Sequence, residues 1–286
     1  MILATDVDGT LIERGHVLTS ENAHAIAALV RKGWVFAAIT GQNVFDIEKR
    51  LTTSLSEVGV NSFTVYTCEG ARRWMFRAGH PALDQRYERG QLFQKQDRRE
   101  LDRALFEFVR GTGKAEYGRF EFAGWWEEAI FVLKLRDPAA ADRREITAEL
   151  YMLLSQRLRP DLMDMVEIRI AGRTTVILTR RSVNKAMALQ DLRNRWHWAE
   201  ILYIGDEFGP FGNDAPTIGI PGVQLVSVGE VPTTRGDRVT WMGGGPPATF
   251  RLIRKFAYSG LLPTHHLKGG GSEHEGGEAE SYRSGS

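Results

Sequence analysis

The sequence predicts an α/β protein whose parallel-sheet core is interrupted by an inserted α+β domain with an antiparallel sheet. Three observations predict this architecture. Short apolar segments alternate with helical segments over residues 1–75, and the same alternation returns over 181–262. The intervening residues, 76–180, follow the order α-β-β-α-β-β. Strand-helix alternation favours a parallel sheet covered by helices on both faces, whereas strands joined by hairpins favour an antiparallel sheet.

The first core segment shows clear starts and ends of its helices. Ser20 and Asn43 are suitable N-cap residues, and Gly33 follows the first helix where glycine commonly ends one. The strands are short, apolar and rich in β-branched or aromatic residues. In chain order we expect a strand over 2–7, a helix over 20–32, a strand over 35–39, a helix over 43–57 and a strand over 63–67.

The inserted segment is expected to contain two helices and two hairpins. Pro138 suits the first turn of the second helix, where an amide hydrogen is not needed. Ala171-Gly172 supplies a turn between two alternating strands. We expect a helix over 97–110, strands over 116–123 and 129–135, a helix over 138–157, and strands over 164–170 and 173–179.

The second core segment predicts a helix, two strands and a final helix, over 184–196, 201–204, 223–228 and 249–259. The run from Gly243 to Pro247 lacks the Lys-Ser/Thr of a phosphate-binding loop and is interpreted as a turn before the last helix. Residues 263–286 are rich in Gly, Ser and Glu with few apolar residues, so a disordered tail is expected there.

Composition limits the possible partners and the compartment. The 286 residues contain 37 Lys plus Arg against 36 Asp plus Glu, so no overall field favours nucleic acid or an anionic membrane. The single cysteine, Cys68, excludes an internal disulfide and fits a reducing compartment. No apolar run approaches the length of a membrane span, and the N-terminus lacks a signal-peptide pattern. We therefore expect a cytoplasmic monomer or homodimer that acts on a small molecule.

Acidic and polar residues stand where the core strands end. Asp6 and Asp8 follow the first strand, with Gly9 allowing a sharp turn, while Thr40 and Asp206 follow two further strands. In an open α/β sheet, ligands bind beyond the carboxyl ends of the strands. Parallel strands would therefore bring these side chains to one edge, and two carboxylates one residue apart suit an aspartyl-phosphate enzyme.

The order of these motifs along the chain resembles the haloacid dehalogenase-like (HAD) phosphohydrolase superfamily. The motifs are Asp6-Val7-Asp8-Gly9-Thr10, Thr40-Gly41, Lys185, and Gly205-Asp206 with Asn213-Asp214. The resemblance implies a Rossmann-like core. It also implies that the insertion between the Thr and Lys motifs is a C2-type cap domain, since the short stretch from the first motif to the second leaves no room for the alternative cap position.

The resemblance also implies roles for the motif residues. Asp6 would attack phosphorus and form an acyl-phosphate, and Asp8 would serve as general acid for the departing alkoxide and then as base for water. Thr40 would donate its hydroxyl to the transferring phosphoryl group together with the Gly41 amide. Lys185 would neutralise the charge that develops on that group. Taken alone, Asp8 and Thr40 could be loop or N-cap residues, and Lys185 a surface residue.

A divalent cation is expected among the carboxylates. Two carboxylates about 4 Å apart repel by roughly 4 kcal/mol at an effective dielectric constant near 20, and a hard cation removes this repulsion. Mg²⁺ is favoured because it keeps water ligands and binds phosphate oxygens. The resemblance implies that Asp6 and Asp206 bind it through side chains and Asp8 through its backbone carbonyl, with Asp214 or Asn213 acting through water or as a supporting group.

Further residues are candidates for substrate binding. Gln42 stands beside the Thr-Gly motif where relatives often carry Arg or Ser. Arg169 and Arg173 lie across a predicted cap hairpin and could bind a substrate anion, or could be solvated surface residues. Trp125 and Trp126 could stack on a sugar, but neighbouring strand residues point to opposite sides, so at most one can face the cleft.

Two alternatives to a phosphatase stay open. The long spacing from Asp206 to Asn213 and the segment 45–48 resemble eukaryotic-type phosphomannomutase, although the apolar strand 130–133 disfavours a grip on a second phosphate. A HAD-fold binding protein without turnover is disfavoured by the intact acidic and lysine motifs. The sequence thus predicts a Mg²⁺-dependent phosphomonoester hydrolase acting on a small phosphorylated metabolite, with a sugar phosphate expected and a phosphosugar mutase as the alternative.

Overall fold

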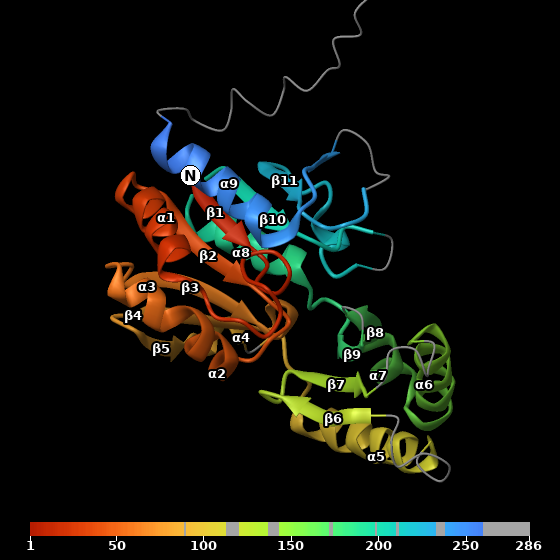
Figure 1. Cartoon of the computed structure of the whole chain (residues 1–286). Coiled ribbons are helices and arrows are strands. Elements are labelled where there is room, and N and C mark those ends of the chain that lie inside the picture. The colour runs from red at the N-terminus through yellow and green to blue at the C-terminus, as the bar shows by residue number, and fades with distance from the viewer. Residues whose placement is uncertain are drawn as a thin grey trace, which may run out of the picture.

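The computed structural model describes residues 1–88, 90–112, 120–136, 143–171, 174–197, 199–209, 212–232 and 238–259. These residues form two sheets, one in a core and one in a smaller lobe built from the inserted segment (Figure 1). The tail over 263–286, Pro138, Gly172 and Arg173 lie outside the described residues. No helix in the described part of the chain is both long and apolar enough to cross a membrane.

The core sheet has eight strands, and its central strands are parallel. Strand β1 lies in the middle, between β2 and β10, as expected for a doubly wound sheet. The order is β12 (Val239–Trp241), β11 (Val223–Ser227), β10 (Ile201–Gly205), β1 (Ile2–Thr5), β2 (Val35–Ile39), β3 (Ser62–Thr67), β4 (Arg72–Arg77) and β5 (His80–Leu83).

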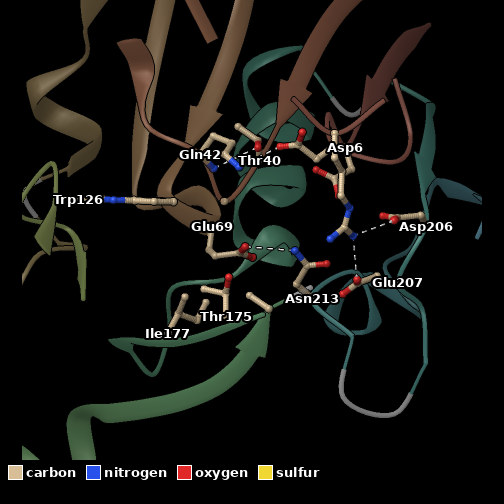
Figure 2. Close-up of a pocket in the computed structure, with 14 residues that line it drawn as sticks. Asp6, Thr40, Gln42, Glu69, Trp126, Thr175, Ile177, Asp206, Glu207 and Asn213 are labelled. Atoms are coloured by element: carbon tan, nitrogen blue, oxygen red, sulfur yellow. Dashed lines mark hydrogen bonds and ion pairs between the residues drawn. The ribbon is translucent and has the colours of Figure 1, made fainter. Parts of the chain in front are cut away.

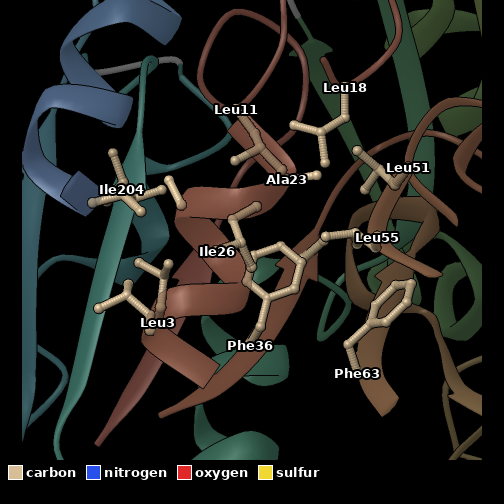
Figure 3. Close-up of a cluster of buried hydrophobic side chains, with 14 of the residues drawn as sticks. Leu3, Leu11, Leu18, Ala23, Ile26, Phe36, Leu51, Leu55, Phe63 and Ile204 are labelled. Atoms are coloured by element: carbon tan, nitrogen blue, oxygen red, sulfur yellow. The ribbon is translucent and has the colours of Figure 1, made fainter. Parts of the chain in front are cut away.

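Helices cover both faces of the core sheet. On one face, α1 (Ser20–Arg31) and α9 (Gly245–Tyr258) pack against Leu3 and Phe36, and Figure 3 shows these side chains meeting Ile26. On the other face, α8 (Lys185–Arg195) packs against Ile2 and its neighbours. Alternate residues of β1 therefore enter different clusters, which is the strand period expected for a sheet buried on both sides.

The antiparallel hairpin β4–β5 was not predicted from the sequence. It extends the core sheet beyond β3, with β4 pairing antiparallel to both neighbours. Core strands thus continue to Leu83, past the limit at residue 75 that the sequence suggested. The strand carries Arg72, Arg73 and Arg77 near the sheet edge, so its charged residues hide the apolar alternation on which the prediction depended.

The cap sheet has the order β6 (Phe120–Trp126), β7 (Ile130–Leu135), β9 (Thr175–Arg180) and β8 (Val166–Ala171), and all neighbours are antiparallel. Its outer face packs on α5 (Lys95–Thr112), α6 (Arg143–Arg157) and α7 (Pro160–Met165). Its inner face carries Ile130, Val132 and Ile177, which pack with Ala71 and Val183 of the core segments. The inner face therefore lies toward the core.

Several element boundaries differ from the predictions. The side chain that caps α1 is Thr19 and not Ser20, since Thr19 accepts a hydrogen bond from the Asn22 amide. The strand expected from residue 164 starts at Val166, because Pro160 begins the short helix α7 first. The last helix starts at Gly245, earlier than expected. The other short helices are α4 (Gln85–Glu88) and the 3₁₀ turns Cys68–Gly70 and Ala215–Thr217.

The helix expected over 43–57 is helical throughout but changes its winding. It runs as α2 (Val44–Ile47), a π-helical segment (Glu48–Thr52) and α3 (Thr53–Glu57). Asn43 caps its start as predicted, with its side chain accepting from the Asp46 amide at 3.0 Å. π-Helical turns are rare and often occur at functional sites. Hydrophobic periodicity alone does not reveal such a change.

Candidate active site

A pocket lies between the carboxyl ends of the central core strands and the inner face of the cap (Figure 2). Parallel pairing of β10, β1, β2 and β3 aligns their ends, so the residues that follow these strands meet at one edge. The pocket is lined by Asp6, Asp8, Arg14, Thr40, Gly41, Gln42, Glu69, Trp126, Ala171, Thr175, Ile177, Asp206, Glu207 and Asn213. The structure thus brings the three strand-end motifs together.

Lys185 is held between two carboxylates beneath the pocket. It begins α8, where Asn184 caps the helix by accepting from the Met187 amide at 3.1 Å. The Lys185 Nζ lies 2.8 Å from an oxygen of Asp6 and 2.8 Å from an oxygen of Asp214. Lys185 is 0% exposed. A fully buried ammonium group is tolerated here because it is paired on both sides.

Burial and neighbouring charges shift both ends of this ion pair. Burial raises the pKa of Asp6 well above its usual range, although the Lys185 charge opposes the rise. Burial alone would lower the pKa of Lys185, but the carboxylates of Asp214 and Asp6 raise it above its ordinary value. Lys185 therefore stays protonated, as a group that neutralises negative charge must.

Asp214 anchors the loop after β10. Its Oδ1 accepts from the Tyr203 hydroxyl at 2.5 Å and from Lys185, while its Oδ2 accepts from the amides of Asp206 and Glu207 at 3.0 and 2.9 Å. A Cβ at Gly205 would lie 2.5 Å from Asp214 Oδ2, which explains the glycine of this motif. Both Asp214 oxygens are thus already used, and the residue is better placed to support a metal ligand than to be one.

Three carboxylates form a candidate cation site. Oxygens of Asp6, Asp206 and Asp214 all lie within 4.8 Å of one another. Burial, and then the nearby charges of Asp214 and Glu207, raise the pKa of Asp206 to about 7. Gly9 makes room for this group, because a Cβ there would lie 2.6 Å from Asp206 Oδ2. Closely spaced buried carboxylates fit a hard divalent cation such as Mg²⁺, which would relieve their repulsion.

Asp8 stands at the edge of the pocket and has two partners. Gln42 donates its Nε2 to Asp8 Oδ2 at 2.9 Å, and Arg50 donates its Nη2 to Asp8 Oδ1 at 2.6 Å. Arg50 also donates to the carbonyl groups of His16 and Glu13, so it ties the loop after β1 to the π-helical segment. Gln42 therefore orients Asp8 as well as lining the pocket, and Arg50 is a site residue that the sequence analysis missed.

Thr40 and Gly41 follow β2 as predicted and both line the pocket. The Thr40 amide donates to the Tyr66 carbonyl at 2.9 Å, and its hydroxyl accepts from the Gln42 amide at 3.1 Å. A Cβ at Gly41 would come within 2.5 Å of Glu69 Oε1, so a larger residue there would displace that carboxylate. The sequence analysis also missed Glu69, which belongs to no motif that it used.

The cap side of the pocket is mostly apolar. Its lining residues are Trp126, Ala171, Thr175 and Ile177. Trp126 faces the pocket, whereas Trp125 enters the cap core and donates its indole N–H to Asp102 at 2.6 Å. The expectation that at most one tryptophan faces the cleft therefore agrees with the geometry, and Trp126 is that residue.

The structure does not bring Arg169 into the pocket. Its guanidinium donates to the Thr179 hydroxyl at 3.0 Å and to the Val183 carbonyl, and its Nε lies 3.5 Å from Glu167. Arg169 therefore connects the cap strands to the chain that returns to the core. A different arginine lines the pocket: Arg14, from the loop after β1, lies 3.7 Å from Asp206 and 3.3 Å from Glu207.

A buried glutamate joins the cap to the core beside the pocket. Glu127, in the turn between β6 and β7, accepts hydrogen bonds from the Val44 amide at the start of α2 and from the Thr67 hydroxyl. It also lies 3.9 Å from Arg72. Burial raises the pKa of Glu127 above its ordinary value. These contacts hold the tip of the cap hairpin against the loops that follow β2 and β3.

Comparison with known proteins agrees with the predicted superfamily. Residues 3–74 match the family of haloacid dehalogenase-like hydrolases, a segment that contains Asp6, Asp8 and Thr40. The match supports, for this segment, the superfamily that the motifs predicted. No curated protein sequence matches the chain.

Solved structures share the fold of nearly the whole chain. A haloacid dehalogenase-like hydrolase from Bacteroides thetaiotaomicron is 14% identical, with a TM-score of 0.62, covering 89% of this chain and 98% of that one. The trehalose-6-phosphate phosphatase C-terminal domain of C. albicans is 14% identical, with a TM-score of 0.61 and coverage of 90% and 92%. An IMP-bound, N-terminally truncated IMP-nucleotidase of Plasmodium falciparum is 16% identical, with a TM-score of 0.59 and coverage of 88% and 67%. At these identities the likeness establishes the fold, and the predicted fold class is confirmed.

Proposed function

We propose that the protein is a Mg²⁺-dependent phosphomonoester hydrolase acting on a small phosphorylated metabolite, with a sugar phosphate as the expected substrate class. The observation that carries this proposal is the convergence of Asp6, Lys185 and Asp206 at one edge of the parallel sheet. The family match to hydrolases supports it, as does the fold shared with a trehalose-6-phosphate phosphatase and an IMP-nucleotidase. A cytoplasmic location, a monomeric or homodimeric state and the lack of nucleic-acid or membrane partners stay predictions.

The proposed reaction has two displacements. Asp6 attacks phosphorus, the bond from phosphorus to the ester oxygen breaks, and Asp8 gives a proton to the departing alkoxide. Asp8 then takes a proton from water as the water attacks the acyl-phosphate, which frees inorganic phosphate and restores Asp6. Lys185 and Thr40 stabilise charge on the transferring phosphoryl group. Mg²⁺, held by Asp6, Asp206 and the Asp8 carbonyl, with Asn213 and Asp214 in support, would supply further positive charge to the phosphoryl oxygens.

A phosphosugar mutase is the alternative that shares these first steps. Such an enzyme needs cationic groups that hold a second phosphate on the cap side. Among the described residues, those that the cap contributes to the pocket are Trp126, Ala171, Thr175 and Ile177, which include no cation. The described part of this wall therefore offers no charge to hold a second phosphate, which supports transfer to water, while Arg173 lies outside the described residues. A requirement for a sugar bisphosphate activator in the kinetics would reverse this preference.

The proposal is tested by phosphate release from a panel of phosphorylated metabolites and a generic aryl phosphate, with and without Mg²⁺. Asp6→Asn provides the blank, since it keeps the shape of the side chain but cannot form the acyl-phosphate. We expect Mg²⁺-dependent release by the wild type and essentially none by the variant, with both proteins equally folded by circular dichroism. Equal rates in the two proteins would rule out Asp6 as nucleophile, and no release from any compound would favour a binding protein.

A further inference from the structure

Glu69 occupies a backbone position that few glutamates adopt. It follows β3 with φ of 59° and ψ of 23°, between Cys68 at φ 53° and Gly70 at φ 98°. Left-handed backbone is unfavourable for non-glycine residues, and asparagine tolerates it better than glutamate. Glu69 is also only 1% exposed. A long acidic side chain is therefore kept at a position where backbone and solvation both disfavour it.

The Glu69 carboxylate lies in the pocket, between the phosphoryl-binding loop and the cap. Its Oε1 accepts from Asn213 Nδ2 at 3.2 Å and lies 2.5 Å from where a Cβ of Gly41 would be. Figure 2 shows Glu69 with Thr40 and Gln42 on one side and Thr175 and Ile177 on the other. Among the described residues, nothing donates a hydrogen bond to its Oε2, although that atom is buried.

A buried carboxylate oxygen without a donor destabilises the free protein, and a bound ligand can supply the missing hydrogen bond. Lys185, a buried cation of the same site, is already held by Asp6 and Asp214. If the phosphoryl group binds at Thr40 and Gly41, the part of the substrate that meets Glu69 is the leaving group close to its ester oxygen. That part must carry a hydrogen-bond donor, because a phosphate oxygen would only repel the carboxylate.

We propose that Glu69 is a specificity-determining residue that accepts a hydrogen bond from a hydroxyl or ammonium group next to the phosphoester bond of the substrate. This inference rests on the proposed phosphatase function and narrows its substrate class. Polyol, sugar and amino-alcohol phosphates carry such a donor, whereas simple alkyl phosphates do not. The apolar faces of Trp126 and Ile177 then cover the carbon atoms of the leaving group.

The test uses three small esters that differ only in the group next to the ester carbon: 2-hydroxyethyl phosphate, 2-aminoethyl phosphate and ethyl phosphate. We expect the wild type to hydrolyse the hydroxyl or the ammonium compound with kcat/KM about tenfold to a hundredfold above that for ethyl phosphate, since hydrogen bonds to charged groups are among the stronger ones. The same comparison is made with the panel metabolite that is hydrolysed with the highest kcat/KM and with an analogue of it that lacks the hydroxyl or ammonium group next to the phosphoester bond.

Two variants of Glu69 separate recognition from folding. Glu69→Asn suits the left-handed backbone but withdraws the carboxylate, so the preference for the donor compounds is expected to fall to about onefold. Glu69→Gln keeps the length and one acceptor but removes the charge. If the natural donor is ammonium, its preference is lost in this variant; if it is a hydroxyl, part of the preference stays.

Glu128 supplies a matched control. It has a similar left-handed backbone, with φ of 60°, but its side chain is 69% exposed and pairs with Arg98. Glu128→Asn should leave the substrate preference unchanged. A purely structural role for Glu69 would lower all rates alike and keep their ratio. Equal wild-type rates on matched pairs, or an unchanged ratio in both Glu69 variants, would overturn the inference, whereas no phosphate release from any compound would overturn the proposed function instead.

Discussion

The two sides of the pocket are built in opposite ways. The core side presents carboxylates and cations fixed by buried hydrogen bonds, such as Lys185 between Asp6 and Asp214. The described cap residues that line the pocket are mainly apolar, such as Trp126 and Ile177. Charge stabilisation requires groups that are oriented before the substrate arrives, whereas selection by an apolar wall depends on shape. Under the proposed function, the core side would carry the chemistry, while Glu69 on the core side and the apolar residues of the cap would together select the substrate.

Replacing a charged residue is expected to lower the stability of the protein more on the core side than on the cap side. The core side concentrates Asp6, Asp206 and Asp214 around one lysine, so loss of that cation leaves repelling buried carboxylates. By contrast, the cap ion pair between Lys134 and Glu121, at 3.0 Å, is exposed to solvent. Exposed pairs contribute little because water and salt screen them. Four measurements test this contrast, beginning with the largest expected effect.

Replacing the buried lysine should affect both chemistry and folding. Lys185→Met is expected to abolish phosphate release and to lower the free energy of unfolding by about 3–5 kcal/mol, because it leaves Asp6 and Asp214 buried without a cation to neutralise them. Lys134→Met on the cap should change stability by less than about 1 kcal/mol and keep turnover. Urea unfolding and phosphate release measure the two effects. Similar losses in both variants would contradict the contrast between the two sides.

Stability without metal should depend on pH through Asp206. Its folded pKa is raised from an ordinary value of 3.8 to about 7, so the unfolded chain loses this proton first as pH rises. Stability is therefore expected to fall between about pH 4 and 7, by about 1.4 kcal/mol per pH unit at most, and to level off above.

Mg²⁺ should oppose this loss by favouring the ionised carboxylates, which would raise the Tm above pH 7 by an amount that grows with the logarithm of the Mg²⁺ concentration. Thermal melts in chelator and in Mg²⁺ across this range test the effect. Asp206→Asn serves as the control and should flatten both responses. A wild-type Tm that does not change with Mg²⁺ concentration at any pH would count against the cation site.

The contact between the two sides is tested at Glu127. Glu127→Gln keeps the shape of the side chain but weakens the hydrogen bonds from the Val44 amide and the Thr67 hydroxyl. We expect a loss of about 1–2 kcal/mol in stability and a severalfold rise in KM, with kcat less affected. Glu128→Gln, its exposed neighbour, is the control. If KM stays unchanged while stability falls, the hairpin tip supports the fold without setting the pocket.

The smallest effect is expected from the loss of one methylene group on the cap strand β9. Ile177→Val removes a methylene group from the pocket wall, and Leu178→Val removes one from the cap core on the opposite face. The first should change kcat/KM ratios among panel substrates by up to about tenfold, and the second should leave these ratios intact. Both should lower stability by about 1 kcal/mol. Altered ratios in the Leu178 variant would show that the wall is not the selective surface.

The sequence predicted the strands and helices of the core well because their signals are local. Apolar runs, N-caps such as Asn43 and strand-helix alternation are visible without the fold. The hairpin β4–β5 at the end of the sheet and the π-helical segment carrying Arg50 were missed, since the charged residues of β4 and a changed helical winding leave no apolar period. Arg169 was a candidate for substrate binding, but its guanidinium donates to the Val183 carbonyl instead. The position of a residue in a strand does not determine which group its long side chain contacts.

The sequence by itself determined the parallel core and the meeting of Asp6, Thr40 and Asp206 at one edge, because these residues follow strand ends that any parallel sheet aligns. The tertiary structure alone decided that Glu69 meets Asn213, 144 positions along the chain. It also decided that the cap presents a mostly apolar wall. Contacts between distant segments depend on sheet register and on cap placement, and neither is encoded in a local pattern of residues.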